Sequence, residues 1–179
     1  SAQWKYGNKT LYLAILISFS LIAYHHFNFG FVMSKDYSTW VFSADNLIKL
    51  KFNFYNYYIY SKTSSALSFF YIIPVFLISL TKILFGSNWE YAFMSLNLIL
   101  IFFSLIIFSK SLLLLKVRPL VITLAMPLLV LSVDLLVWPR YILSDTVFAF
   151  GILFTVYFVI KSIVIEKFNY FFISLLVIL

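Results

Sequence analysis

Long apolar runs that almost lack charged side chains constrain this sequence more than any other feature. Two of them, residues 91–109 and 119–137, follow each other across one short basic segment. A helix needs about 20 apolar residues to cross the hydrocarbon core of a bilayer, and both runs reach that length. Charged residues make up 11% of the chain, against about 25% in a soluble domain. We therefore expect an integral membrane protein.

Three further apolar runs extend the predicted bundle. Residues 11–29 and 141–160 are long enough to span, and residues 168–179 begin another span. Lys5 and Lys9 precede the first run, which no cleavage pattern follows, so we expect an uncleaved anchor with a cytoplasmic N-terminus. The fold class is all-α, a polytopic transmembrane helical bundle that forms one membrane domain. Because the last run is cut short, we expect the N-terminal part of a longer chain.

The segment after the first span predicts helices at the membrane surface. Over residues 37–51 apolar side chains recur at spacings of three and four, which is typical of an amphipathic helix lying on a membrane. Residues 52–65, rich in Asn, Tyr, Ser and Thr, predict an interfacial loop. Residues 66–85 are apolar but contain Pro74 and Lys82. This run either spans the membrane or forms a re-entrant or juxtamembrane helix.

Basic residues distinguish the two topologies. If residues 66–85 span, the basic residues of 110–118 and Lys161 lie outside the cell, against the tendency of Lys and Arg to stay in the cytoplasm. If residues 66–85 do not span, those basic residues are cytoplasmic, and Asp36 and Asp145 lie outside together. We favour the second topology, with juxtamembrane helices in the first external loop.

Composition excludes several classes of function. The net charge of +7 comes from 13 Lys and Arg spread along the chain rather than from one basic stripe, so we expect no nucleic-acid partner. Cysteine is absent, which removes thiolate chemistry and sulfur-ligated metals. No phosphate-binding glycine loop, HExxH or Gly-x-Ser-x-Gly motif occurs. His25 and His26 are adjacent, hence on different helix faces, and we assign no metal ligand.

Two isolated acids are candidates for chemistry. Asp36 follows the first span and Asp145 begins the run to residue 160. A carboxylate within hydrogen-bond reach of a substrate hydroxyl can act as a general base. The alternative is structural, because Ser34 or Asp36, and likewise Ser144 or Asp145, are suited to cap the N-terminus of the following helix. The sequence leaves both alternatives open for each acid.

Arg140 is the candidate for binding an anionic group. It lies five residues before Asp145, between Trp138 and Tyr141. A guanidinium group binds phosphate oxygens in a fork. The alternative is an anchor whose charged end reaches the membrane interface beside the two aromatic residues.

The order of these features resembles the N-terminal module of the GT-C glycosyltransferases, a family that includes the protein mannosyltransferases and the aminoarabinose transferase of lipid A. The segments that carry the resemblance are Lys35-Asp36-Tyr37, Ala44-Asp45-Asn46-Leu47, a Lys-Thr-Ser-Ser segment leading to Tyr71-Ile72-Ile73-Pro74, Leu84-Phe85-Gly86-Ser87-Asn88-Trp89 and Leu143-Ser144-Asp145-Thr146-Val147-Phe148. The chain departs from the family where many relatives have Asp-Glu in place of Asp36-Tyr37.

The resemblance implies a membrane glycosyltransferase. Asp36 then looks like the catalytic carboxylate, Asp145 like the second acid, and Lys62 and Arg140 like ligands of the lipid phosphate. The implied donor is a polyprenyl-phosphate sugar and the acceptor a lipid, glycan or protein on the external side of a membrane, which we expect to be a bacterial inner membrane. No metal site is assigned, and a divalent cation is left open as a cofactor.

Two other classes of protein account for the same sequence. The first is a non-catalytic structural subunit of a larger membrane complex, with the acids as helix caps. The second is a transporter fragment with Asp134 and Asp145 on an ion path, which requires an internal repeat that the sequence does not show.

Overall fold

The computed structural model is helical, as predicted. It describes residues 2–142, 145–166 and 169–170, and among these no strand occurs; Val32 and Tyr141 form an isolated parallel bridge. The helices are α1 (Ala2–Phe29), α2 (Tyr37–Lys49), α3 (Phe54–Thr63), η1 (Phe69–Tyr71), α4 (Ile72–Phe85), η2 (Gly86–Asn88), α5 (Trp89–Leu114), α6 (Pro119–Val130), α7 (Val133–Val137), η3 (Trp138–Arg140) and α8 (Asp145–Ile165).

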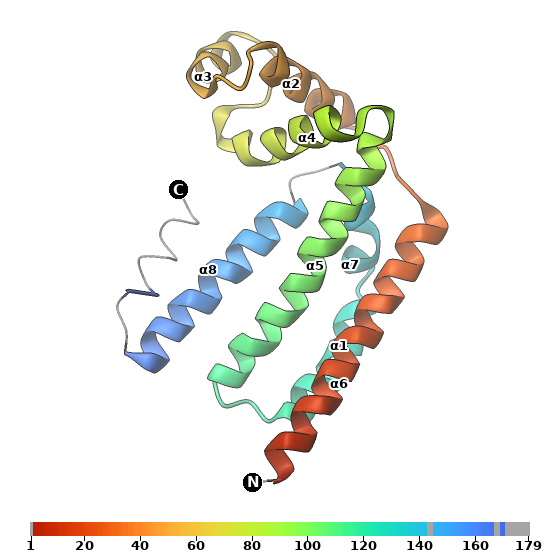
Figure 1. The fold of residues 1–179 in the computed structure, drawn as a ribbon, viewed down its shortest axis with the longest axis vertical. Coiled ribbons are helices and arrows are strands. Elements are labelled where there is room, and N and C mark those ends of the chain that lie inside the picture. The colour runs from red at the N-terminus through yellow and green to blue at the C-terminus, as the bar shows by residue number, and fades with distance from the viewer. Residues whose placement is uncertain (1, 143–144, 167–168, 171–179) are drawn as a thin grey trace.

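Three helical stretches identify a membrane protein. Lys9–Phe29, Phe69–Leu114 and Asp145–Ile165 are long and apolar enough to cross a membrane. The second stretch is not one rod, because α4 lies across the end of α5 and the chain turns between them at Gly86, whose φ of +53° suits glycine (Figure 1). The candidate spans therefore include α1, α5 and α8, which run lengthwise in the bundle.

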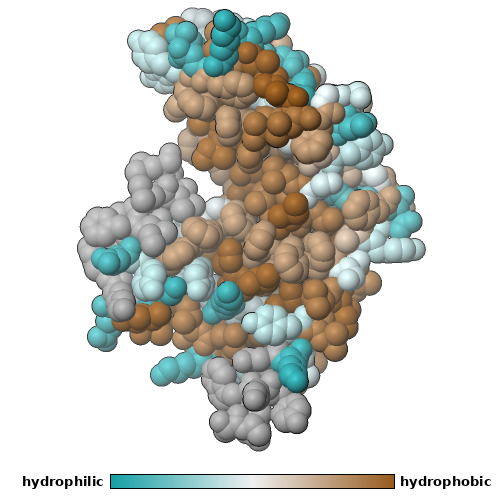
Figure 2. Space-filling view, in the orientation of Figure 1, coloured by the Kyte–Doolittle hydropathy of each residue, from teal (hydrophilic) through white to brown (hydrophobic). Residues whose placement is uncertain are grey.

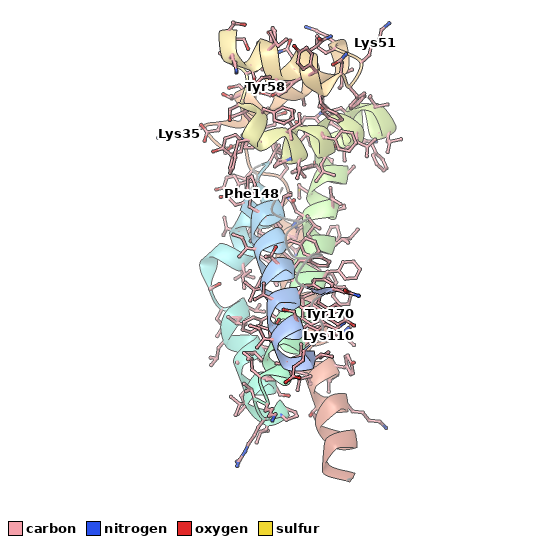
Figure 3. The ribbon with its side chains drawn as sticks, turned by 90° about the vertical axis from the view of Figure 1, so that its left-hand side faces the viewer. Lys35, Lys51, Tyr58, Lys110, Phe148 and Tyr170 are labelled. Carbon is pink, nitrogen blue, oxygen red and sulfur yellow. The ribbon has the colours of Figure 1, made fainter. Side chains whose placement is uncertain are left out.

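A layer of short helices lies across one end of the bundle. Figures 1 and 3 show α2, α3 and α4 at the same end, next to the C-terminal end of α1 and the beginning of α8. In the space-filling view, apolar side chains cover most of the middle of the visible face, and hydrophilic ones gather over α2 and α3 (Figure 2). The outer part of the crosswise layer, α2 and α3, is thus polar on this face, whereas α4 is apolar.

Two apolar clusters hold the structure together. One joins the lengthwise helices α1, α5 and α6 through buried residues such as Ile22, Leu105 and Met126. The other joins α2 and α4 to the beginning of α5, and includes Leu47 and Phe93. The second cluster fixes the crosswise layer on the bundle and so determines where the loop after α1 lies.

The loop predicted over residues 52–65 is wrong, because most of that segment is helix α3. The side chain of Asn53 accepts a hydrogen bond of 3.0 Å from the backbone N–H of Asn56 and so caps the helix N-terminus. Tyr57 is fully buried, and its hydroxyl donates to the carbonyl of Leu67 at 3.0 Å. The polar composition of this segment favours a loop, but packing of Tyr57 against the rest of the chain stabilises a helix there.

The segment 119–137, expected to be one continuous span, is divided in two. Helix α6 ends at Val130 and α7 begins at Val133. Pro127 lies inside α6 and has no N–H to donate to the carbonyl four residues earlier, which weakens the helix just before it ends. The segment still runs along α1, against which α6 packs (Figure 1).

Candidate functional site

The two candidate acids belong to segments that lie side by side at the crosswise layer. The backbone N–H of Val32 donates to the carbonyl of Arg140 at 3.1 Å, next to the parallel bridge between Val32 and Tyr141. Asp36 follows the first of these segments and Asp145 follows the second. The structure therefore places both acids at the same end of the bundle.

Tyr71 links the helices that the two acids begin. Trp40, one turn after Asp36, meets the ring of Tyr71 edge-on, with 5.7 Å between ring centroids. Phe148, three residues after Asp145, meets the same ring at 6.0 Å. Figure 3 shows Phe148 directly below the layer that carries Lys35. The first turns of α2 and α8 thus both contact the ring of Tyr71.

Asp36 occupies the cap position of α2 without capping it through its side chain. Its backbone carbonyl accepts hydrogen bonds from Thr39 and Trp40 at 3.0 and 3.1 Å, but its carboxylate makes no capping hydrogen bond. The hydroxyl of Ser34, the alternative cap, has no partner either among the described residues. The Asp36 side chain is exposed. The structural alternative therefore does not account for this carboxylate.

Asp145 is the first residue of α8 and is half-buried. A carboxylate there is favoured by the helix dipole, because the first N–H groups of the helix point toward it. The predicted capping role of Ser144 falls on residues 143–144, outside those that the structure describes.

Arg140 binds the end of α1. Its Nε donates to the carbonyl of Gly30 and its Nη2 to the carbonyl of Phe29, both at 2.8 Å. The guanidinium also lies over the Phe29 ring, 5.4 Å from its centroid. Carbonyls at a helix C-terminus lack helical partners, so Arg140 satisfies them and joins α1 to η3. Two of its five N–H donors are used in this way, and its predicted role as a phosphate ligand stays a prediction.

Lys62 lies on α3, at the outer part of the crosswise layer. Its ammonium group is placed over the ring of Tyr58, 4.1 Å from the centroid, and its side chain is exposed. Among the described contacts, none joins Lys62 to Asp36 or Asp145. The structure therefore places the two acids at adjoining segments but does not bring Lys62 into contact with them.

The sequence analysis missed a polar network where α2, α4 and α5 meet. The hydroxyl of Tyr37 donates to a carboxylate oxygen of Glu90, and burial together with this hydrogen bond raises the pKa of Tyr37 to about 12. Lys82 forms an ion pair with Asp45 and lies over the Trp89 ring at 5.1 Å. The sequence contained one sign of this network. Lys82 and Glu90 occur beside long apolar runs, where a charged side chain needs a partner.

Neither the protein-family models nor the curated proteins nor the solved structures contain a match to this chain. Within the part of the chain that the structure describes, no group of three His, Cys, Asp or Glu residues is arranged to hold a metal ion. A function for this chain is therefore inferred from its own residues.

Proposed function

We propose that the chain is the membrane module of a GT-C-type glycosyltransferase, which moves a sugar from a polyprenyl-phosphate donor to an acceptor on the external side of the membrane. The observation that carries the proposal is Asp36, an exposed carboxylate that begins α2 without capping it. Its segment adjoins the segment that leads to Asp145, the second acid of the implied site.

The basic residues at the end of the bundle opposite the crosswise layer support an external site, whereas Lys49, Lys51 and Lys62 stay external in either topology. Lys9 lies in the part of α1 distant from the crosswise layer, and Lys116 and Arg118 lie where α5 turns into α6 at that same distant end (Figure 1). With those residues in the cytoplasm, as the positive-inside tendency favours, Asp36 and Asp145 face outward. The crosswise position of α4 supports a juxtamembrane helix rather than a span at residues 72–85.

In the proposed reaction Asp36 accepts the proton of the acceptor hydroxyl. The hydroxyl oxygen forms a bond to the anomeric carbon of the sugar, and the bond from that carbon to the lipid phosphate oxygen breaks. Negative charge then develops on the departing lipid phosphate, and Lys62 or the free donors of Arg140 balance it. Asp145 orients the acceptor, and a divalent cation remains open as a cofactor.

Substitution of Asp36 tests the proposal. Asp36→Asn keeps the shape of the side chain and removes its basicity, so transfer of a labelled sugar from polyprenyl phosphate in membrane vesicles should fall by about 10²-fold or more. Glu166→Gln, an exposed acid just after α8, is the matched control and should transfer at the parental rate. Equal transfer by Asp36→Asn and the parent protein would falsify the proposal.

A non-catalytic subunit is the second candidate, and the use made of Arg140 favours it. In the structure two of the N–H groups of this side chain cap α1. Within the described part of the chain, the most apolar stretch of Asp145–Ile165 has no buried side chain, which suits packing against other membrane helices. If this candidate is right, Ile152→Arg on exposed α8 releases the chain from its complex, while Asp36→Asn leaves the complex and its activity intact.

A further inference from the structure

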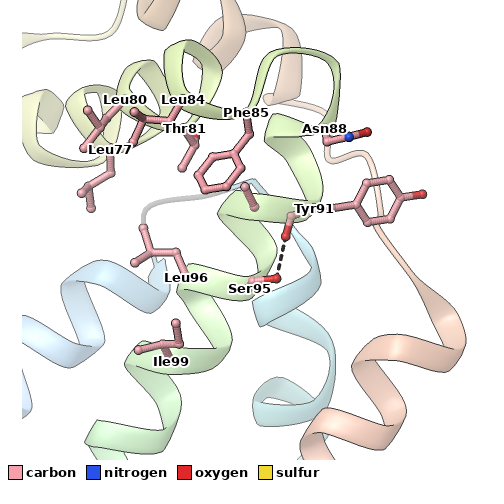
Figure 4. A pocket seen from close by; sticks show the side chains of 11 residues that line it. Leu77, Leu80, Thr81, Leu84, Phe85, Asn88, Tyr91, Ser95, Leu96 and Ile99 are labelled. Atoms are coloured by element: carbon pink, nitrogen blue, oxygen red, sulfur yellow. Dashed lines mark hydrogen bonds between the residues drawn. The ribbon is translucent and has the colours of Figure 1, made fainter.

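An open groove lies in the angle between α4 and α5. Its volume is about 520 Å³, and its walls are apolar side chains of both helices (Figure 4). Leu77, Leu80 and Leu84 come from α4, and Leu96 and Ile99 come from α5. Ligand pockets commonly have volumes of about 300–1,000 Å³ and mostly apolar walls, so the groove has the size and lining of a binding site.

Four polar side chains line the groove. That of Thr81, among the leucines of α4, donates to the carbonyl of Ile78 at 2.8 Å and is satisfied within its own helix. Asn88 and Tyr91 lie beside η2, away from the leucines of α4 (Figure 4). The hydroxyl of Ser95 donates to the carbonyl of Tyr91 at 2.8 Å, so it is satisfied within α5. An occupant that fits this arrangement has a long apolar part and one polar end.

The groove is continuous with the surface that faces lipid. Tyr91, Ser95, Ile99 and Phe103 recur every four residues on α5 and are exposed, Tyr91 by 62% and Phe103 by 48%. Residues four apart lie on one face of a helix. The first three line the groove and the fourth extends the same stripe along the candidate span. The bilayer that covers Phe103 therefore also reaches the groove.

Helix α4 forms the other edge of this lipid-facing surface. Leu84 is 65% exposed, and Ile83 and Phe85 beside it are exposed as well. Because α4 lies across the end of α5, these side chains stand near the boundary between hydrocarbon and headgroups once α5 spans (Figure 1). Apolar side chains at that depth are stabilised by acyl chains, since transfer out of water is favourable for them.

We propose that the groove binds one acyl chain of a membrane phospholipid from the leaflet at the crosswise layer, with the polar end of the lipid beside Asn88. The bound chain fills the angle between α4 and α5 and so stabilises the crosswise position of α4. This lipid is a resident of the groove and not the sugar donor, so the inference does not depend on the proposed enzymatic activity.

Photo-crosslinking of a lipid tests the groove directly. The intact protein is reconstituted in vesicles containing a phosphatidylethanolamine with a diazirine in its acyl chain, irradiated and digested, and the modified peptides are identified by mass spectrometry. Adducts are expected on the residues 77–99 that line the groove. Ser95→Trp places a large ring in the groove and should lose these adducts. Phe103→Trp, two turns along the same exposed stripe, is the control and should keep them.

Three results would overturn the inference. One is an even distribution of adducts along the stripe that includes Phe103, which indicates general bilayer contact only. Another is groove adducts that persist in both Ser95→Trp and Leu84→Trp, which fill the groove from α5 and from α4. Crosslinks between two copies through a cysteine introduced at position 84 assign the groove to a second copy and likewise overturn it. Circular dichroism verifies that each variant keeps its helical content.

Discussion

At the scale of single residues, Arg140 joins two segments that are far apart in the sequence. Its two hydrogen bonds reach carbonyls 110 and 111 residues away in the chain. Arg140→Met keeps a long side chain and removes both donors. We expect the free energy of unfolding to fall by about 1.5–3 kcal/mol, the usual contribution of a hydrogen bond from a charged group. Thermal unfolding in detergent micelles measures the change.

The control for this variant is Arg118→Met, which removes an exposed guanidinium at the other end of the bundle. It should change stability by less than about 0.5 kcal/mol, as exposed substitutions commonly do. Should Arg140→Met unfold at the parental temperature, the guanidinium is not needed to cap α1, and a role in binding an anionic ligand becomes the better explanation of this residue.

Tyr37 gives the crosswise layer a dependence on alkaline pH. Burial and the hydrogen bond to Glu90 raise its pKa from 10.0 to about 12, so the folded protein keeps this proton where an unfolded chain has lost it. The stabilisation is therefore complete below pH 10 and is lost as the pH rises to about 12. Tyr37→Phe lacks the hydroxyl, so we expect it to be less stable than the parent at pH 8 and to approach the parent between pH 10 and 12.

Unfolding curves of the parent and Tyr37→Phe at pH 8, 10 and 12 measure this effect. Tyr55→Phe, which alters a 70% exposed tyrosine of the same layer, is the control and should follow the parent at every pH. A constant difference between Tyr37→Phe and the parent across the whole range would contradict the assignment to the Tyr37 hydroxyl.

At the scale of elements, Asn97 joins α5 to the segment that precedes α8. The side chain is fully buried, and its amide nitrogen donates to the carbonyls of Pro139 and Tyr141 at 3.3 and 3.2 Å. Asn97→Leu has similar volume but leaves these carbonyls without their donor, so we expect a loss of about 1–3 kcal/mol of stability. Asn28→Leu, at an exposed amide, is the control. Faster proteolysis after Tyr141 in Asn97→Leu alone would locate the effect.

The elements differ in how far the sequence predicts them. Length and hydropathy are sufficient for α1, α5 and α8, because an apolar run of about 20 residues has few stable arrangements other than a membrane helix. The spacing of apolar residues is sufficient to predict α2, because they recur every three or four residues and form one apolar face of the helix. Neither signal exists for α3, which depends on the burial of Tyr57, a contact that forms only after the chain has folded.

For the candidate site, the sequence shows which residues are unusual but not what they contact. Asp36 and Asp145 stand out because isolated acids beside apolar runs are costly. The partners of Arg140 do not stand out, because they are backbone carbonyls and every residue has one. The sequence therefore suggested Arg140 as a phosphate ligand, which stays a prediction, and showed no sign of its contacts with the end of α1. A contact between two charged side chains, such as Asp45 and Lys82, can be suspected from the residue types in the sequence. A contact with a backbone carbonyl cannot, because the carbonyl is the same at every residue.

For the whole molecule, the orientation in the membrane decides whether the two acids can serve one external site. The chain has no cysteine, so a single cysteine introduced at position 36, 145 or 116 is the only thiol that a maleimide can label. Its labelling shows on which side of the membrane that position lies. In intact cells, a membrane-impermeant maleimide should label Asp36→Cys and Asp145→Cys, because both lie at the crosswise layer. Lys116→Cys lies at the opposite end of the bundle (Figure 1) and should react only after the membrane is opened.

The expected contrast follows from two independent arguments, the distribution of basic residues and the crosswise position of α4, which puts an odd number of crossings between positions 36 and 116. If positions 36 and 116 label from the same side, α4 and α5 both cross and the positive-inside argument fails. If position 145 alone is protected, the two acids are separated by the membrane, and a shared carboxylate site is excluded whatever the activity of Asp36→Asn. Labelling of 36 and 145 together leaves one external surface on which both carboxylates can meet a substrate.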